Sequence, residues 1–191
     1  MRRRTFDALA SIAGLVLVAV LLVAGGLLLW GHNFVDNQVS TQLAAQKIVF
    51  PVKTNAEFKA LPPADAAAMG QYAGQTMTTG AQAKVYADNF TAFHLSKMGG
   101  TYSQLSAQAM TQPNNAKLAA LVNTVFKGTT LRSMLLDAYA FWQIGVIALW
   151  GAIVSFIGAG LLLILSAFGF FHARRVSPAA EILEAPEKVT A

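Results

Sequence analysis

The sequence predicts an all-α protein in which two transmembrane helices continue into an extracytoplasmic α-helical bundle. Three observations predict it. Two long stretches, Ala8–Trp30 and Ala138–Ala173, contain no charged residue, and each exceeds the roughly 20 residues that cross a bilayer. Charged residues make up only 12% of the chain, about half the share of a soluble domain. No segment alternates apolar and polar residues with β-branched enrichment, so no sheet is expected.

The first uncharged stretch predicts a transmembrane helix over residues 8–30, after a short cytoplasmic N-terminus at residues 1–7. The basic run Arg2, Arg3 and Arg4 also suits a cleaved signal peptide. However, the apolar core of a signal peptide has about 7 to 15 residues, and no A-x-A cleavage pattern follows this longer stretch. We therefore favour an uncleaved membrane anchor.

The second transmembrane helix is predicted over residues 150–172, followed by a cytoplasmic tail at residues 173–191 that is polar enough to be disordered. Arg174 and Arg175 mark its inner end. Counting about 20 to 24 helical residues outward from the basic groups places the outer surface near Trp150 on one helix and near Trp30 on the other. Because tryptophan favours the membrane interface, both residues are expected to anchor the helices there.

Lysine and arginine beside the ends of the spans predict a protein of the plasma (inner) membrane with both termini in the cytoplasm. Residues 31–149 would then form the extracytoplasmic domain, since long loops are translocated largely regardless of their charge. The net charge of +5 is explained mostly by this topology. Membrane lipids are thus expected partners, and nucleic acid is not.

Helical spacing and breaker residues divide the predicted domain. The first helix is expected to run on to about Gln46, because no proline interrupts it before Pro51. A connector over residues 48–61 is predicted next, then a helix from Pro62 to about Gly74. A helix over residues 81–98 would be capped by Thr79 and stopped by glycines.

Three further helices complete the prediction. Thr101 is expected to cap a short helix that ends near Met110. The stretch Pro113-Asn114-Asn115 would begin another, which ends at Gly128. The last helix is then expected to start at Thr129 or Thr130 and to continue without a proline into the second span.

Small residues are spaced along both spans and predict close helix packing. They could serve the hairpin itself, a homo-oligomer or docking to another membrane protein. The residues concerned are Gly14, Gly151, Ser155, Gly158 and Ala159.

The sequence offers no constellation for catalysis, a cofactor or a metal. Cysteine is absent, and the three histidines are not at metal-ligand spacing on one helix. No G-x-S-x-G motif and no phosphate-binding loop occurs. Asp137, although surrounded by apolar residues, is expected to lie outside the membrane, either paired with Arg132 or a neighbouring lysine or solvated.

The stretches YAGQTMTTGAQAKVYADNFTAFHL (residues 72–95) and VFKGTTLRSMLLDAYAFW (residues 125–142) are similar to a group of actinobacterial two-span membrane proteins of unknown function. Some members carry a label as aromatic ring-opening dioxygenases. The chain offers no iron-ligand constellation for that activity. The resemblance implies the two-span architecture and no catalytic residue.

These observations favour a non-catalytic membrane protein, a scaffold or an accessory subunit of a cell-envelope complex. Its partner would be a second copy of the chain or another membrane protein. A sensor or a ligand- or lipid-binding ectodomain is the alternative, although its cytoplasmic tail is short. Tyr139, Phe141 and Trp142 form the candidate partner surface, because they lie on the predicted extension of the second span above the membrane.

Overall fold

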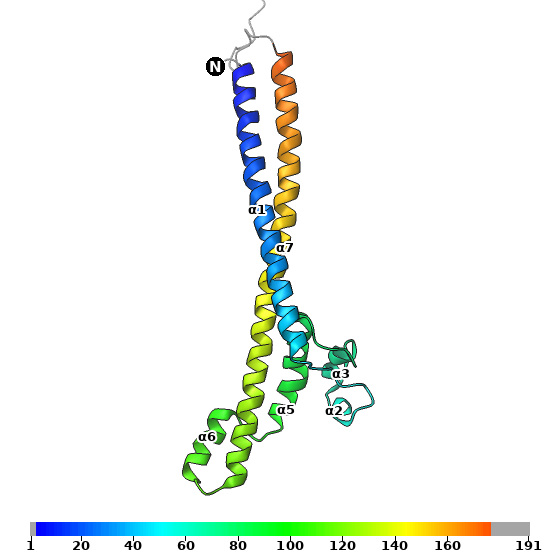
Figure 1. Cartoon of the computed structure of the whole chain (residues 1–191), viewed down its shortest axis with the longest axis vertical. Helices are drawn as coiled ribbons and strands as arrows, with labels where there is room; N and C mark the ends of the chain where they lie inside the picture. Colours follow the sequence, from blue (N-terminus) through cyan, green and yellow to red (C-terminus); the bar gives the residue numbers. More distant parts are fainter. Residues whose placement is uncertain (1–2, 177–191) are drawn as a thin grey trace, which may run out of the picture. The chain divides into compact units, whose positions relative to one another are not determined.

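The computed structural model describes residues 3–176, and over that range it contains helices and no β-strand (Figure 1). The chain divides into two units. A hairpin unit comprises residues 3–31 and 147–176, and a helical domain comprises residues 32–146. Arg2 and the predicted tail from residue 177 onward lie outside the described residues.

Two helices are long and apolar enough to cross a membrane: α1 (Arg3–Ala45) and α7 (Ala116–Arg175). The first helix runs past Trp30, as predicted, and ends close to Gln46. In the hairpin unit the two helices lie side by side and antiparallel (Figure 1).

Small side chains fill the seam of the hairpin unit. The buried positions on α7 are spaced by seven residues, at Ala152, Ala159, Ser166 and Ala173. On α1 the buried residues Ser11, Val18 and Gly25 follow the same spacing. A seven-residue repeat amounts to 3.5 residues per turn, which keeps one helix face on its neighbour in a left-handed supercoil.

Two reciprocal serine–glycine contacts interlock one end of this seam. Ser11 of α1 lies against Gly169 of α7, and Ser166 of α7 lies against Gly14 of α1. A Cβ atom at either glycine would collide with the opposite hydroxyl oxygen. Each glycine therefore provides the space that the facing serine occupies. The Ser11 hydroxyl donates a hydrogen bond to the Asp7 carbonyl, 2.8 Å away, so its polar group is satisfied inside the helix.

Beyond these contacts, Asp7 of α1 faces His172 of α7. The Asp7 Oδ2 atom is 3.8 Å from His172 Nε2. It is buried and accepts no hydrogen bond from the described residues.

The helix α7 is continuous across Gly128, so the prediction of two helices that meet there was wrong. A glycine that ends a helix commonly has a positive φ, and Gly128 does not. Its role is steric, because a Cβ at this position would lie 2.8 Å from Leu95 Cδ2. The observed helix starts at Ala116, directly after the predicted start at Pro113-Asn114-Asn115, and the Asn115 side chain accepts a hydrogen bond from the Leu118 amide.

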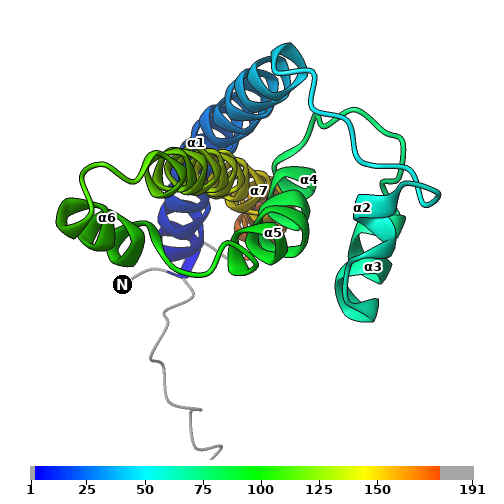
Figure 2. The ribbon, with the colours of Figure 1, turned by 90° about the horizontal axis from the view of Figure 1, so that it is seen from below.

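The predicted helix over residues 81–98 contains an irregularity that the sequence pattern did not reveal. It consists of α4 (Gly80–Val85), a π-helical turn η1 (Tyr86–Thr91) and α5 (Ala92–Ser96). Thr79 caps its start in a capping box, as predicted, and Gly99 follows its end with φ +80°. Thr101 likewise caps α6 (Tyr102–Thr111). Figure 2 shows α6 and α5 on different sides of the domain part of α7.

The remaining segment folds between α1 and α4. It contains α2 (Ala56–Lys59), inside the predicted connector, and α3 (Pro63–Gly70), which ends before the predicted Gly74. Its two ends are joined by backbone hydrogen bonds, including one of 2.8 Å from the Met77 amide to the Ile48 carbonyl. Phe50, Met69 and Met77 are fully buried beside Leu43 of α1. Burying such a side chain stabilises a fold by about 1.5–3 kcal/mol.

Candidate functional site

A groove of about 650 Å³ runs between α1 and α7 in the helical domain. We call it the α1/α7 groove. Apolar side chains from both helices make up most of its lining, and four polar side chains complete it. The lining residues are Phe34, Val35, Gln38, Val39, Gln42, Leu43, Gln46, Ile48, Leu131, Met134, Leu135, Asp137, Ala138 and Phe141.

The floor of the groove belongs to the domain core, whereas its edges are uncovered. Val39, Leu43 and Leu135 are buried in the core cluster. In contrast, Phe34 is 52% exposed, Met134 64% and Phe141 62%. Large apolar groups grouped in this way mark interaction sites more often than isolated exposed ones do.

The polar side chains are divided between the two edges. Gln38 and Gln42 lie four residues apart on α1, so they share one helix face, and Gln46 follows directly after the end of the helix at Ala45. Their side-chain amides form no hydrogen bond with any group in residues 3–176. Asp137 is the charged residue of the lining, and it stands on α7. One edge therefore carries amide groups and the other carries a carboxylate.

Contacts near His32 show which residues of α1 lie beside which residues of α7 in the domain. Its Nδ1 atom lies 2.9 Å from the carbonyl oxygen of Gly145. A Cβ at Gly145 would be 3.3 Å from Val35 Cγ1, so glycine permits this close approach. Asp137 lies eight residues before Gly145 on α7, about 12 Å away, which places it at the level of residues 40–43 of α1.

The three aromatic residues of the predicted partner surface have different environments in the fold. Trp142 packs against Gly80 at the start of α4 and contributes to the domain core. Tyr139 is half-buried, with the Lys84 ammonium 5.2 Å from its ring centre. Phe141, on the other hand, lines the α1/α7 groove. Of the three aromatic residues, Phe141 is thus the one that the domain leaves mostly exposed.

An ionic cluster joins the π-helical turn to α7. Asp88 accepts a hydrogen bond of 2.6 Å from Lys84 and one of 2.9 Å from Arg132, whose Nε also donates to the Ala87 carbonyl. The hydrogen bond from Lys84, together with the charges of Lys84 and Arg132, lowers the pKa of Asp88, and the same bond raises the pKa of Lys84. Since Arg132 is bound here, the predicted Arg132–Asp137 pair does not form, and Asp137 is exposed to solvent.

Replacing Arg132 with Met should lower the free energy of unfolding by about 1 kcal/mol, because the pair is partly exposed and solvent screens it. The folded-state pKa of Asp88 lies below its ordinary value of 3.8, so the contribution is present above that value. It is lost as the pH falls through the folded-state pKa. Denaturant unfolding of both proteins at neutral and acidic pH measures this, with Lys117→Met as the exposed control. An equal loss in the control would contradict the role of the cluster.

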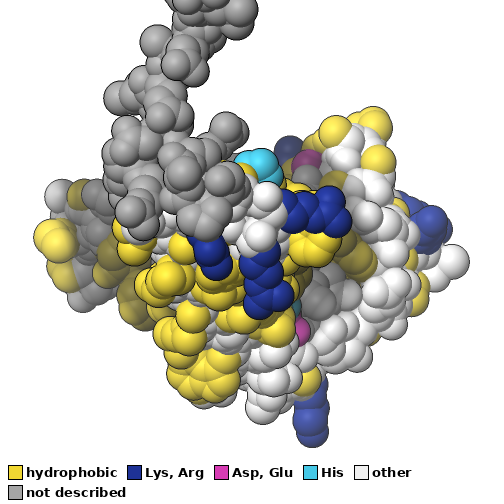
Figure 3. Space-filling view, turned by 90° about the horizontal axis from the view of Figure 1, so that it is seen from above, with side chains coloured by type: hydrophobic (Ala, Val, Ile, Leu, Met, Phe, Trp, Pro, Cys, Tyr) yellow, Lys and Arg dark blue, Asp and Glu magenta, His cyan; other side chains and the backbone are white. Residues whose placement is uncertain are grey.

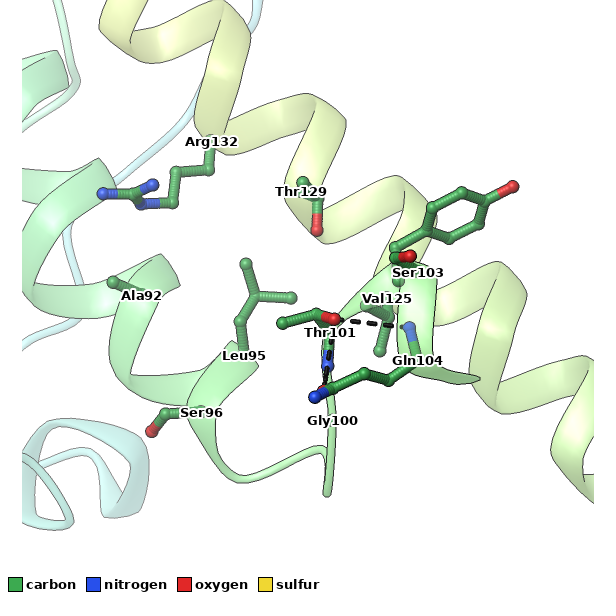
Figure 4. Close-up of a pocket in the computed structure, with 11 residues that line it drawn as sticks. Ala92, Leu95, Ser96, Gly100, Thr101, Ser103, Gln104, Val125, Thr129 and Arg132 are labelled. Atoms are coloured by element: carbon green, nitrogen blue, oxygen red, sulfur yellow. Dashed lines mark hydrogen bonds between the residues drawn. The ribbon is translucent and has the colours of Figure 1, made fainter. Parts of the chain in front are cut away.

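A second pocket, of about 550 Å³, lies between α5, α6 and α7 (Figure 4). Thr101 and Gln104 stand inside it and are hydrogen-bonded to each other in the capping box of α6. Arg132 extends away from them, toward the π-helical turn. Thr101, Gln104 and Arg132 therefore already have hydrogen-bond partners in the fold.

The histidines and carboxylates do not form a metal site within residues 3–176. His94 hydrogen-bonds the Phe90 carbonyl at 2.8 Å, and its ring packs on the Phe90 ring. His32 binds the backbone of Gly145, and His172 faces Asp7.

The other predicted residues lie in the hairpin unit. Trp30 and Trp150 are 67% and 63% exposed. Arg4, Arg174 and Arg175 are exposed, and the Arg175 guanidinium stacks on Phe171 at 4.3 Å. Figure 3, a view from above, shows basic side chains in dark blue beside apolar ones in yellow. Nothing is described of Arg2 or of the Arg3 side chain.

The predicted small residues of the spans lie at or near the hairpin seam. A Cβ at Gly151 would be 3.1 Å from Leu28 Cδ1, and one at Gly158 would be 3.4 Å from Leu21 Cδ1. Ala159 is buried, Ser155 is half-buried and Gly14 faces Ser166. Within one chain, these small residues thus allow α1 and α7 to approach each other.

No family model, curated protein or solved structure matches the chain. The resemblance to actinobacterial two-span proteins therefore stays a prediction.

Of the exposed residues at the edges of the groove, sequence reasoning proposed Phe141 for a partner surface but not Phe34, Met134 or the glutamines. The glutamine row was visible as three identical residues at four-residue spacing. Its meaning depended on which face of α1 the core leaves open, and that is a tertiary property.

Proposed function

We propose that the chain is a non-catalytic membrane protein that acts as a scaffold or an accessory subunit of a cell-envelope complex, with a helix docking in the α1/α7 groove. The observation that carries the proposal is the apolar edge of that groove, where Phe34, Met134 and Phe141 are each more than half exposed. A groove between two helices with such an edge fits the apolar face of a further helix.

The two long apolar helices support a membrane location. Membrane association also suits a docking function, because two proteins held in one membrane meet at a higher effective concentration than they do in solution. We propose further that the helical domain is extracytoplasmic, as the basic residues at the inner ends of the spans predict.

A photo-crosslinking amino acid at Phe141 tests the docking function in the native membrane. We expect an adduct that contains a membrane helix, either of a second copy or of one defined protein, identified by mass spectrometry of the crosslinked peptides. The same probe at Lys127, an exposed residue of α7 outside the groove, should give little adduct. Lipid adducts alone at Phe141 would contradict the proposal.

Ligand or lipid binding by the domain is a second candidate function, because the groove volume falls within the range of small-molecule sites, about 300–1,000 Å³. A screen of lipids and small molecules by thermal shift should then yield at least one saturable stabilisation. Phe141→Ala should abolish that stabilisation, while Lys127→Ala should preserve it.

A further inference from the structure

We propose that the α1/α7 groove binds the same groove of a second copy of this chain, so that two domains form a four-helix bundle about a two-fold axis parallel to the helices. This inference rests on the proposed docking function and names the partner. In such an arrangement α1 of one copy lies opposite α7 of the other, and every neighbouring pair of helices is antiparallel.

The polar groups of the groove are complementary under this symmetry. The α1 edge carries the amides of Gln38 and Gln42, with Gln46 directly after the helix end, whereas the α7 edge carries the carboxylate of Asp137. Because the two-fold axis brings α1 of one copy to α7 of the other, the carboxylate meets amide donors and not a second carboxylate. An amide can donate to it without a charged partner.

The positions of the residues along the two helices identify which glutamine meets Asp137. Asp137 lies at the level of residues 40–43 of α1, as the contacts of Gly145 with His32 and Val35 indicate. Gln42 is the exposed amide residue within that range. We therefore infer two symmetric hydrogen bonds, each from Gln42 of one copy to Asp137 of the other.

The apolar edge fits the same arrangement. By the same count, Phe141 lies at the level of residues 36–39 of α1. It would enter the groove of the second copy beside Gln38, and its exposed ring would become buried. A two-fold axis parallel to the helices leaves every residue at its own level, so residues of equal level can meet.

The absence of cysteine from the natural chain makes a direct crosslinking test possible. Gln42→Cys with one affinity tag and Asp137→Cys with another are expressed together in one membrane and oxidised. We expect a disulfide-linked dimer that carries both tags. Gln42→Cys together with Ser133→Cys, an exposed α7 position outside the groove lining, is the matched control and should crosslink far less.

A polar exchange tests the assigned pair without cysteine. Gln42→Glu faces the carboxylate of the second copy and should weaken dimerisation about tenfold or more. The double variant Gln42→Glu/Asp137→Gln exchanges the acid and the amide, and should restore wild-type dimerisation. Dimerisation is measured by energy transfer between labelled copies in nanodiscs, with thermal unfolding to confirm that each variant is folded.

The outcomes separate this inference from the proposed function. Equal crosslinking of the test and control pairs, or a double variant no better than Gln42→Glu, would overturn the assignment of a second copy. A Phe141 photo-adduct with a different membrane protein would overturn it too, while it would support the docking function. The absence of any protein adduct at Phe141 would overturn both.

Discussion

Gly80→Ala will destabilise the helical domain by about 1–3 kcal/mol, although it adds a single methyl group. The new Cβ would overlap Cβ of Trp142 and lie 2.6 Å from its Cγ and 3.1 Å from the Ala138 carbonyl oxygen. The backbone of α7 and the base of a large side chain cannot move aside as a flexible side-chain end can. Alanine is otherwise the better helix former, so a loss of stability would have to come from this contact.

Thermal or denaturant unfolding of the purified protein measures the Gly80 effect. Gly31→Ala is the control, since a Cβ there meets no atom within 4 Å, and it should be neutral or slightly stabilising. In a Trp142→Gly background, which removes the Cβ together with the ring, the cost of Gly80→Ala should shrink. An unchanged cost in that background would show that the packing of Trp142 on Gly80 is not responsible.

Gly14→Ala will destabilise the hairpin unit by about 1–3 kcal/mol, through overlap of the new Cβ with the Ser166 hydroxyl oxygen. The structure also indicates a second substitution that should restore the stability. The new methyl group at residue 14 would be 3.5 Å from Ser166 Cβ, an ordinary contact, so Gly14→Ala/Ser166→Ala should regain most of the loss.

Unfolding in a denaturing detergent measures the hairpin effect. Gly160→Ala, on the same pair of helices but with no atom within 4 Å of its Cβ, is the control and should be neutral or stabilising. Equal effects at Gly14 and Gly160 would contradict the interlocking of serine and glycine. Gly169→Ala with Ser11→Ala repeats the test at the reciprocal contact.

Local chemistry explains which parts of the fold could be predicted. Thr79 and Thr101 were identified as helix caps because a threonine hydroxyl binds an amide three residues ahead, whatever surrounds the helix. The length of α1 followed in the same way from the absence of proline. Such features depend on a few neighbouring residues, and the sequence contains them all.

The features that were predicted wrongly or missed depend on contacts between residues far apart in the sequence. Gly128 resembled a helix end, but Leu95, far away in the chain, explains the glycine. The π-helical turn has no local breaker residue, and its Asn89 side chain bonds the Val85 carbonyl within the turn. The α1/α7 groove was not predictable for the same reason, since it depends on which helix faces the core leaves uncovered.

The seven-residue spacing of the hairpin seam has a mechanical consequence. If α7 slid along α1 by one residue, the serine hydroxyls would move out of the spaces beside Gly14 and Gly169 and meet neighbouring side chains. Rotation of α7 about its own axis would replace the buried small residues with large ones such as Leu161 or Phe168, which are now exposed. Both motions are blocked at the same contacts. Under load, this paired segment would therefore bend or tilt as one rod before its two helices shifted past each other.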